Sequence, residues 1–323
     1  MIRRARRAVP LLVAIAISGS LLYVSLQGIE WAQVGHTIAG ADPIVLGLVC
    51  ALACGTLFLR ALRWRVLLTA DASISPAEAF WATAAGYFGN NFLPARAGEL
   101  VRMHMVARQR NMPHAFVLAT AIAERVADAI VLICISAAVI LTSHVEAGWM
   151  LGAARTLGVV CLLAAAALAV TPFMEEPAIR LVARLPLPAG ARHHLLEWLE
   201  HGVRGIRAFH SPVRLATFVG YTLVIWLIDA VGTVIGASAL GLHMPLRAAF
   251  LLLAGLGLGS ALPSTPGSVG IYQFVAVSVL VPFGFSRTSA VAYILVAQAL
   301  SYVVIGIWGG IAVWRYRATR RSV

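Results

Sequence analysis

Long apolar runs recur throughout this sequence and leave few folds open to it. Runs of roughly 18 or more apolar residues return along the 323-residue chain, and that length is typical of a helix that spans a membrane. The chain is 60% hydrophobic and 12% charged, whereas a soluble domain carries about 25% charged residues. No stretch shows the sustained alternation of a membrane β-barrel strand. The sequence therefore predicts an all-α, polytopic membrane helix bundle.

The basic residues predict how this bundle lies in the membrane. Arginines cluster at the ends of the apolar runs, the chain has no lysine, and its formal net charge is +12. Positive residues stay on the cytoplasmic side of a membrane and face anionic lipid, so we expect no nucleic-acid partner. About six full spans follow, with both termini in the cytoplasm of a multi-pass cell-membrane protein. The predicted spans are 9–27, 43–62, 114–142, 148–171, 213–240 and 288–314.

Two interrupted apolar segments do not fit this pattern of full spans. The first contains "GYFGNNFLPARAGELVRMHMVARQR", residues 86–110. If 77–94 crossed completely, the arginines that follow would lie outside and break the positive-inside rule. A hairpin that enters from the cytoplasm and turns near Pro94 avoids this, provided that protein or water surrounds its irregular backbone. The second segment, around "GSALPSTPGSV", would enter the membrane from the opposite side. Its two arms are either re-entrant or fully crossing, and the sequence leaves both arrangements open.

The two interrupted segments resemble each other. Both contain an L-P-x-x-x-G turn, which begins at Leu93 in the first and at Leu262 in the second. Paired interrupted segments of opposite orientation are typical of inverted-repeat transporters, although a short match can arise by coincidence. We expect a single membrane domain over 1–323, with half-repeats of about 43–142 and 213–314.

The segment 173–212 is the one sizeable piece predicted outside the membrane. Its apolar residues fall near helical spacing and its arginines lie between them, which indicates an amphipathic helix on the inner membrane face. His193, Glu197 and His201 follow at i, i+4 and i+8, a conceivable metal-binding face. A solvated helix face is the preferred interpretation, and we expect no metal and no cofactor.

Charged residues inside the apolar runs are the candidates for function. Glu124 and Asp128 share a helix face, and Arg125 lies three residues from Asp128. These residues are ten to fourteen positions after His114, roughly 15–21 Å into the bundle. Asp229 is similarly placed in a later span. Each such charge costs at least ~2.5–3.5 kcal/mol to insert, so these side chains form either an ion-pair network that locks the bundle or a polar cavity.

In the cavity interpretation, arginine forks would hold an anionic head group through two charge-assisted hydrogen bonds. No catalytic residue is assigned. The candidate head-group residues are Asn90, Asn91, Arg96, Glu99, Arg102, Glu124, Arg125, Asp128 and Asp229. The candidate turn residues are Pro94, Gly98, Pro263, Pro266, Gly267 and Gly270. Glycines along both hairpins would admit a ligand or a neighbouring helix, and helix packing is at least as good an explanation.

Three stretches carry a resemblance to a known family. "NNFLPARAGELVR", "ERVAD" and "LPSTPGSVGIYQF" resemble the lysylphosphatidylglycerol synthase transmembrane-region family of flippase-like membrane proteins, and the resemblance covers most of the chain. Two positions depart from the family pattern. Gln273 stands where the family usually carries Glu, and Gln298 stands where a basic residue often occurs. The residues that match the pattern are Asn91, Pro94, Gly98, Glu99, Arg102, Glu124, Arg125, Asp128, Pro266, Gly267 and Gly270.

The resemblance implies movement of lipids or lipid-linked head groups across a bacterial inner membrane. The expected partners are membrane lipids, such as an anionic phospholipid, a glycolipid or a polyprenyl-phosphate carrier, and a separately encoded lipid-synthesis enzyme or glycosyltransferase. One alternative is an intramembrane lipid-modifying transferase that uses Glu99, Glu124 or Asp128 as a base, although no nucleophile elbow, P-loop or zincin helix is present. Another is a non-catalytic membrane partner of a lipid-synthesis enzyme.

Overall fold

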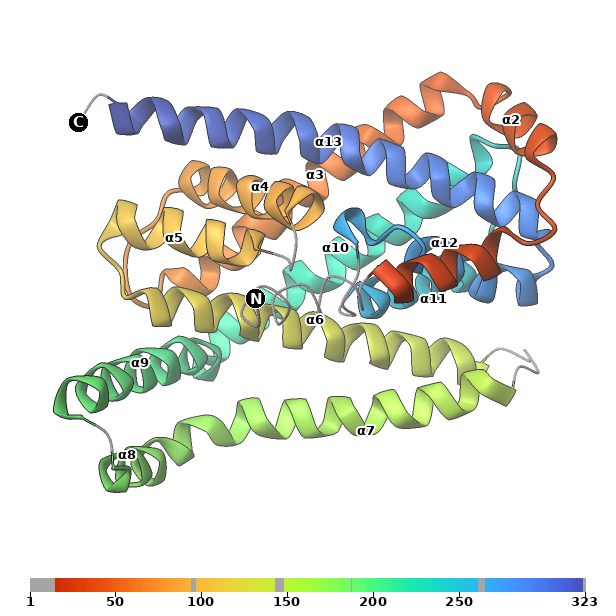
Figure 1. Ribbon diagram of the computed structural model, residues 1–323. Helices are drawn as coiled ribbons and strands as arrows, with labels where there is room; N and C mark the ends of the chain where they lie inside the picture. The colour runs from red at the N-terminus through yellow and green to blue at the C-terminus, as the bar shows by residue number, and fades with distance from the viewer. Residues whose placement is uncertain (1–14, 94–96, 143–147, 187, 261–264, 322–323) are drawn as a thin grey trace, which may run out of the picture.

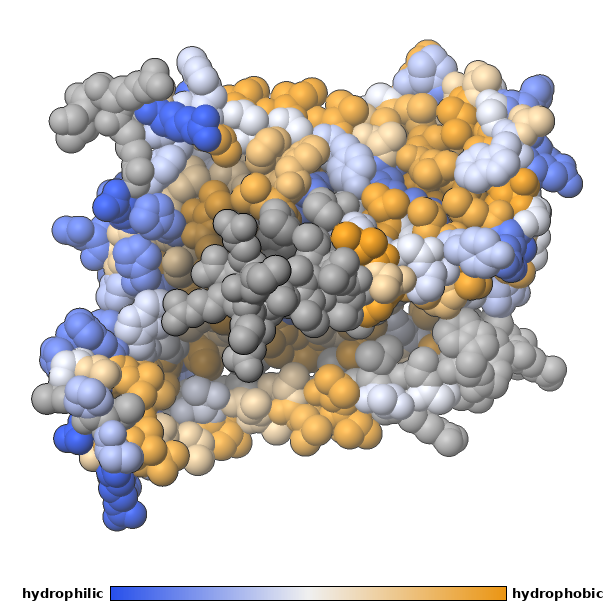
Figure 2. Space-filling view, in the orientation of Figure 1, coloured by the Kyte–Doolittle hydropathy of each residue, from blue (hydrophilic) through white to orange (hydrophobic). Residues whose placement is uncertain are grey.

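The computed structural model describes residues 15–93, 97–142, 148–186, 188–260 and 265–321, and within these ranges the chain forms helices and no strand (Figure 1). The all-α prediction is therefore confirmed. Figure 2 shows apolar side chains over the middle of one face and hydrophilic ones toward both its ends, on the left near α8, α9 and the end of α13 and on the right near α2. Such a distribution is typical of a helix bundle that crosses a membrane.

Three helices in the described part of the chain are long and apolar enough to cross a membrane: α3 (Pro43–Leu68), α10 (Pro212–Ser238) and α13 (Arg287–Arg321). In Figure 1, α6 (His114–Thr142) and α7 (Gly148–Val170) run lengthwise through the bundle. The count of six full spans stays a prediction, since the helix Ile15–Leu26 is short and α6 carries charges in its middle.

Helix α3 shows why one predicted boundary was wrong. The Asp42 side chain accepts hydrogen bonds from the backbone N–H groups of Ile44 and Val45, and a proline follows at the first helical position, so the start is firmly capped. The expected end was residue 62, but the helix runs on to Leu68. Arg60 and Arg63 thus lie within a regular helix, and Arg65 lies in its last turn.

The first interrupted segment folds as two helices, α4 (Pro76–Phe92) and α5 (Gly98–Arg110), which pack against each other. A capping box between Ser75 and Glu78 starts α4. A Cβ atom at Gly98 would overlap the carbonyl oxygen of Gly86 and the Asn90 residue, so glycine permits this close approach and the helix-packing explanation is confirmed here. Pro94 and Arg96 lie outside the described residues.

The second interrupted segment forms α11 (Leu246–Gly259) and α12 (Ile271–Leu280), joined partly by a 3-10 turn over Pro266–Ser268. Gly267 has a φ of 72° and Gly270 a φ of 89°, values that favour glycine. A Cβ atom at Gly267 would also overlap the Tyr302 hydroxyl. Pro263 lies outside the described residues. Gly267 and Gly270 therefore adopt positive φ in the connection between α11 and α12, and the role of the candidate turn residues stays a prediction.

The two hairpins pack on opposite halves of α13. Gly309, in the second half of α13, contacts Phe88 and Ala84 of α4, whereas Gln298, in its first half, bonds Gln273 of α12. In Figure 1 the α4–α5 hairpin occupies the end of the bundle where α13 finishes, and the α11–α12 hairpin the end where α13 begins. An inverted repeat would produce this arrangement, and the repeat itself stays a prediction.

The segment 173–212 contains two helices where one was expected, α8 (Glu175–Arg184) and α9 (Ala189–Arg207). The chain leaves helical geometry at Leu185, and Pro188 precedes α9. Helix α9 packs along α6, with Gly205 against the carbonyl oxygen of Phe116. Helix α8 carries exposed Leu181 and Arg184, and Figure 2 shows apolar and hydrophilic surface side by side at its position. Helix α8 thus exposes apolar and charged side chains together, whereas the predicted amphipathic spacing from Leu195 to Ile206 falls on α9, and an amphipathic helix on the inner membrane face stays a prediction.

Of the histidine face proposed as a metal alternative, His193 and Glu197 lie exposed on α9, whereas His201 is half-buried. His193 is 3.3 Å and His194 3.6 Å from carboxylate oxygens of Glu197, with all three side chains open to solvent. Within the described ranges, no three His, Cys, Asp or Glu side chains group as metal ligands would. Because His201 is half-buried and its Nδ1 has no hydrogen-bond partner among the described residues, the character of a solvated helix surface applies to His193 and Glu197 only.

Candidate functional site

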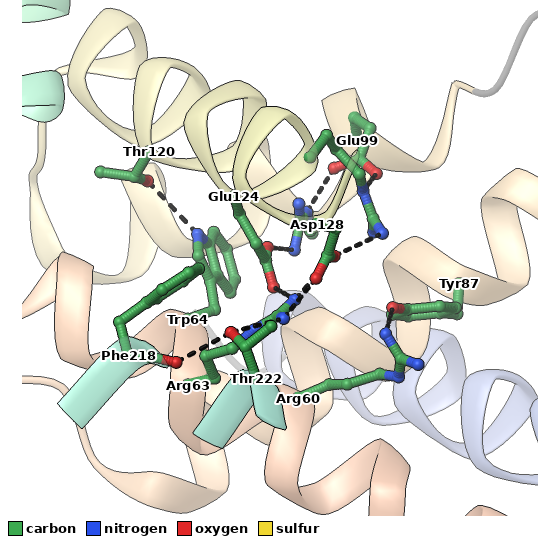
Figure 3. A network of polar contacts seen from close by, with 12 residues as sticks. Arg60, Arg63, Trp64, Tyr87, Glu99, Thr120, Glu124, Asp128, Phe218 and Thr222 are labelled. Atoms are coloured by element: carbon green, nitrogen blue, oxygen red, sulfur yellow. Dashed lines mark hydrogen bonds and ion pairs between the residues drawn. The ribbon is translucent and has the colours of Figure 1, made fainter. Parts of the chain in front are cut away.

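A fully buried arginine on α3 forms the centre of the polar contacts in the bundle (Figure 3). Arg63 has 0% of its side chain exposed; its Nη1 lies 2.5 Å from Asp128 Oδ1, and its Nη2 lies 2.9 Å from Asp128 Oδ2. The same Nη2 donates to Glu124 Oε1 at 2.7 Å, and Nη1 donates to the Thr222 hydroxyl at 3.2 Å. This two-bonded contact is the strong form of an arginine–carboxylate pair. It ties α3 to α6 and α10.

A second buried arginine joins α5 to the same carboxylate. Arg102 is 1% exposed, and its Nη1 donates to Glu124 Oε2 at 2.8 Å. Its Nε lies 2.5 Å from Glu99 Oε2, and its guanidinium lies 4.5 Å from the ring centre of Trp64, a cation–π contact. Glu124 therefore accepts hydrogen bonds from two arginines that belong to different helices.

Arg125 and Glu99 form the more exposed edge of these contacts. Arg125 Nε donates to Glu99 Oε1 at 3.0 Å, and its Nη1 lies 3.9 Å from Asp128 Oδ2. Asn90 donates to the same Glu99 oxygen at 3.1 Å. The Arg125 guanidinium lies 5.3 Å from the ring centre of Tyr87. Asn91, which is half-buried near the end of α4, takes no part in these bonds among the described residues.

Arg60 of α3 is the partner of Asp229, which the sequence could not identify. Its Nη2 lies 2.5 Å from Asp229 Oδ2, and its Nη1 donates to the Tyr87 hydroxyl at 3.5 Å. The guanidinium also lies 5.1 Å from the ring centre of Trp226. Arg60 and Arg63 were both interpreted as arginines at the cytoplasmic end of a span, and both instead pair with carboxylates inside the bundle.

Together these residues form what we call the ion-pair cluster, and its formal charge is balanced. Four arginines face four carboxylates across α3, α5, α6 and α10, and the removal of one partner from such a buried pair strands the other. The network interpretation therefore describes most of the cluster. Its members are Arg60, Arg63, Arg102, Arg125, Glu99, Glu124, Asp128 and Asp229.

A cavity of about 390 Å³ borders one side of the cluster, between α3, α10 and α13. Arg60, Arg125 and Asp229 line its charged end, whereas Arg102 and Glu124 are not among its lining residues. The remaining walls are largely apolar. Along α3 the lining extends from Leu46 to Arg60, which is roughly 21 Å at the helical rise. Of the predicted head-group residues, Arg125 and Asp229 thus face the cavity. The lining aromatic side chains are those of Tyr87, Trp226, Tyr272 and Tyr293.

The corresponding polar contacts around the second hairpin are neutral. Gln273 Nε2 donates to Gln298 Oε1 at 2.9 Å, and both side chains are buried. Gln273 Oε1 accepts from the Gly270 N–H at 2.7 Å. Gln298 Nε2 donates to the Gly267 carbonyl at 2.7 Å and to the Tyr302 hydroxyl at 3.1 Å. The two positions that depart from the family pattern are therefore in direct contact.

Comparisons with known proteins agree with the apolar architecture. The family model described as the lysylphosphatidylglycerol synthase TM region matches residues 11–309. The chain is 27% identical to "Glycosyltransferase AglD" of Haloferax volcanii over 93% of its own length and 52% of that protein, so it spans about half of this relative. It is 25% identical to a "UPF0104 membrane protein" of Methanothermobacter thermautotrophicus, over 87% of this chain and 86% of that one. No solved structure matches. Both relatives are archaeal, and a bacterial inner membrane stays a prediction.

Proposed function

Because the chain belongs to the lysylphosphatidylglycerol synthase transmembrane-region family, we propose that this membrane protein is a transporter that moves a lipid or a lipid-linked head group across the membrane. One observation carries the proposal: the cavity joins a charged end inside the bundle to apolar walls that extend along α3 and α13. A lipid has the same two-part chemistry, since its head group requires polar partners and its chain does not.

The ion-pair cluster gives this cavity a fixed polar floor. Arg63, Arg102 and Glu124 are at most 1% exposed and hold α3, α5 and α6 together. Arg60 and Arg125 are 14% and 34% exposed, so they are the members that a head group reaches. In this division the buried pairs position the helices, and the exposed pairs contact the cargo.

Reconstitution tests the proposal. Purified protein in liposomes should move labelled lipid between leaflets faster than empty liposomes do. The variant Arg125→Gln should slow this movement at least about tenfold, because a charge-assisted contact contributes roughly 1.5–3 kcal/mol. Arg247→Gln is the matched control, because Arg247 is exposed near Phe283 and does not line the cavity. The test panel contains an anionic phospholipid, a glycolipid and a polyprenyl phosphate. Transport would be refuted if liposomes with the protein moved none of these lipids between leaflets faster than liposomes without it.

A second candidate is a non-catalytic membrane partner of a glycolipid-synthesis enzyme. The observation that favours it is the match to a protein named as a glycosyltransferase, about half of whose length this chain spans. Co-purification with a glycosyltransferase, without lipid movement by the purified chain, would support this function over transport. The transferase alternative lacks such support, because Glu99, Glu124 and Asp128 all accept hydrogen bonds from arginines and none is free to act as a base.

A further inference from the structure

We propose that Tyr302 is a positioning residue that holds the inner ends of the two hairpins together, and that these ends separate when lipid passes. The inference rests on the proposed function in one respect, since it takes lipid movement as the event that requires the separation. It adds the place in the bundle where the helices part and the side chain that keeps them closed.

The two hairpins meet beside the middle of α13. Helix α4 ends at Phe92, whose ring centre lies 6.0 Å from that of Tyr302. The 3-10 turn of the second hairpin contacts α4 directly, and the Gly267 carbonyl of this turn accepts a hydrogen bond from the Tyr302 hydroxyl at 3.1 Å. Tyr302 lies roughly 22 Å along α13 from Arg287 at the helical rise, well inside a membrane-spanning helix. One side chain thus touches both hairpins.

The second hairpin's turn is fitted to this hydroxyl. The Gly267 carbonyl also accepts from Gln298 Nε2 at 2.7 Å, and the same nitrogen donates to the Tyr302 oxygen at 3.1 Å. A Cβ atom at Gly267 would overlap that oxygen, so glycine permits the close approach. A backbone carbonyl at membrane depth requires internal donors. Tyr302 supplies one of the two that reach this carbonyl from the described residues.

The contacts where the hairpins meet are easier to open than those in the ion-pair cluster. Separating a buried arginine from its carboxylate strands two charges, and such pairs join α3, α5, α6 and α10. The hairpin ends instead touch through aromatic rings and neutral hydrogen bonds, whose individual contributions are modest. Because Arg102 ties the first hairpin to Glu124 of the cluster, the second hairpin is the one that moves.

Movement of the second hairpin would change the cavity, because both hairpins contribute to its walls. Tyr87 of α4 and Tyr272 of α12 line it, together with Leu253 and Leu256 of α11. The charged end of the cavity belongs to α3, α6 and α10, which the ion pairs hold together. A shift of α11 and α12 would therefore move an apolar wall away from a stationary charged end and widen the cavity between them.

Thiol reactivity tests the role of Tyr302 without a transport assay. In the full chain without native cysteines, Ser268→Cys and Thr288→Cys place thiols at positions that are 8% and 7% exposed in the wild type. Tyr302→Phe keeps the ring beside Phe92 and removes the hydroxyl. We expect it to speed the reaction of Ser268→Cys with a water-soluble methanethiosulfonate severalfold and to leave Thr288→Cys unchanged. Unchanged reactivity at position 268, or an equal rise at both positions, would overturn the role assigned to Tyr302.

A reversible cross-link tests whether the hairpin ends separate during transport. Phe92→Cys with Ser268→Cys, joined by a flexible bis-methanethiosulfonate, ties α4 to the turn that it contacts. Lipid movement in liposomes should fall to the rate of empty liposomes and recover after reduction. Phe58→Cys with Phe80→Cys is the matched control, because these rings lie 6.1 Å apart and link α3 to α4 within the ion-paired part. Its cross-link should leave the rate unchanged, and intact mass measures the extent of both reactions.

The two proposals fail separately. A wild-type chain that moves no lipid would contradict transport, and the reactivity of Ser268→Cys would still decide whether Tyr302 holds the turn. Lipid movement at the normal rate with the hairpin ends fully cross-linked would overturn their separation and leave transport standing. Equal loss of movement with both cross-links would also overturn it, because the effect would then not be specific to the hairpin ends.

Discussion

Polar side chains lie at depth beside both hairpins, but beside α4–α5 they are ionic and beside α11–α12 they are neutral amides. In the first region Glu124 accepts hydrogen bonds from both Arg63 and Arg102, which links three helices. In the second, Gln273 and Gln298 bond each other and the backbone of the turn. The comparison teaches that a broken segment needs internal hydrogen-bond partners but no charge. Among the described residues, the buried charged side chains Arg63, Arg102, Glu124 and Asp128 all belong to the first region.

The two regions also have separate apolar packing. Ala84 and Ala85 of α4 belong to one core with Trp64 of α3, whereas Leu252 of α11 and Leu280 of α12 belong to another. The difference between the hairpins is therefore one of polar chemistry built on comparable hydrophobic support. Single substitutions can change the first without removing the second.

Of the substitutions that test this comparison, Glu124→Gln should lower the free energy of unfolding most. It leaves Arg63 and Arg102 with one full negative charge fewer, and loss of a partner from a buried ion pair costs about 3–5 kcal/mol. Equilibrium unfolding in mixed micelles measures this loss. Glu78→Gln is the control, because its pair with Arg110 is partly exposed and should contribute no more than about 1 kcal/mol. Equal losses in the two variants would contradict a special role for the buried pairs.

Arg102→Lys should have the next largest effect. An ammonium cannot reproduce the separate bonds from Nε and Nη1 that link Glu99 and Glu124, so stability should fall by about 1–3 kcal/mol. Lipid movement per folded molecule should stay near wild type, because Arg102 does not line the cavity. Folded protein is counted by size-exclusion chromatography. A normal yield with slowed transport would instead place Arg102 in contact with the cargo.

An ion pair introduced beside the second hairpin would test whether that neutral region can accommodate charge. Gln273→Glu alone should destabilise the protein because it introduces an unpaired buried carboxylate. Adding Gln298→Arg should recover part of that loss, with a coupling free energy of about 0.5–3 kcal/mol, since the two side chains are 2.9 Å apart. A double-mutant cycle on unfolding free energies gives this value. Strict additivity would show that the second hairpin cannot accommodate an ion pair.

Single cysteines that report the topology of the two hairpins are expected to change stability least. In a background without the native cysteines, a cysteine at Arg108 or Arg192 should react with a membrane-impermeant reagent from the cytoplasm only, and one at Arg247 from outside only. Arg108 lies near the end of α5, Arg192 within α9 and Arg247 at the start of α11, so opposite accessibility of positions 108 and 247 is what an inverted arrangement requires. Reaction of positions 108 and 247 from the same side would exclude it.

Sequence reasoning reached the fold class and most of the site, and its main omissions have a common cause. It found Glu99, Glu124 and Asp128, because carboxylates inside apolar runs are conspicuous. It missed Arg60 and Arg63, because arginines near the end of a span are ordinarily topological. The available signal was their spacing of three residues, which places both on neighbouring positions of one helix face, with no breaker to end the helix before Leu68.

Other features could not be predicted from one sequence. The pairing of Asp229 with Arg60 depends on how α10 packs against α3, a contact between residues 169 positions apart. The split of 173–212 into α8 and α9 depends on how α9 lies along α6, where Gly205 meets the backbone of Phe116. The separation of cavity-lining arginines from buried ones likewise depends on tertiary packing, because Arg102 of α5 and Arg125 of α6 both lie in charged stretches of sequence and their burial differs with the helices packed around them.

The distance along the chain between Arg63 and Glu124 has a consequence for biogenesis. During synthesis α3 emerges before α6, and the carboxylate that neutralises Arg63 follows 61 residues later. Until then the arginine has no partner at membrane depth, so a newly made α3 has to keep Arg60 and Arg63 near the lipid–water boundary, where long arginine side chains can extend to the head groups. Arg63 can then settle to its final depth only as α6 arrives, and Arg60 only as α10 brings Asp229. The ion pairs thus make the insertion of these helices a joint event, and a ribosome stalled between them would leave α3 shallow in the membrane.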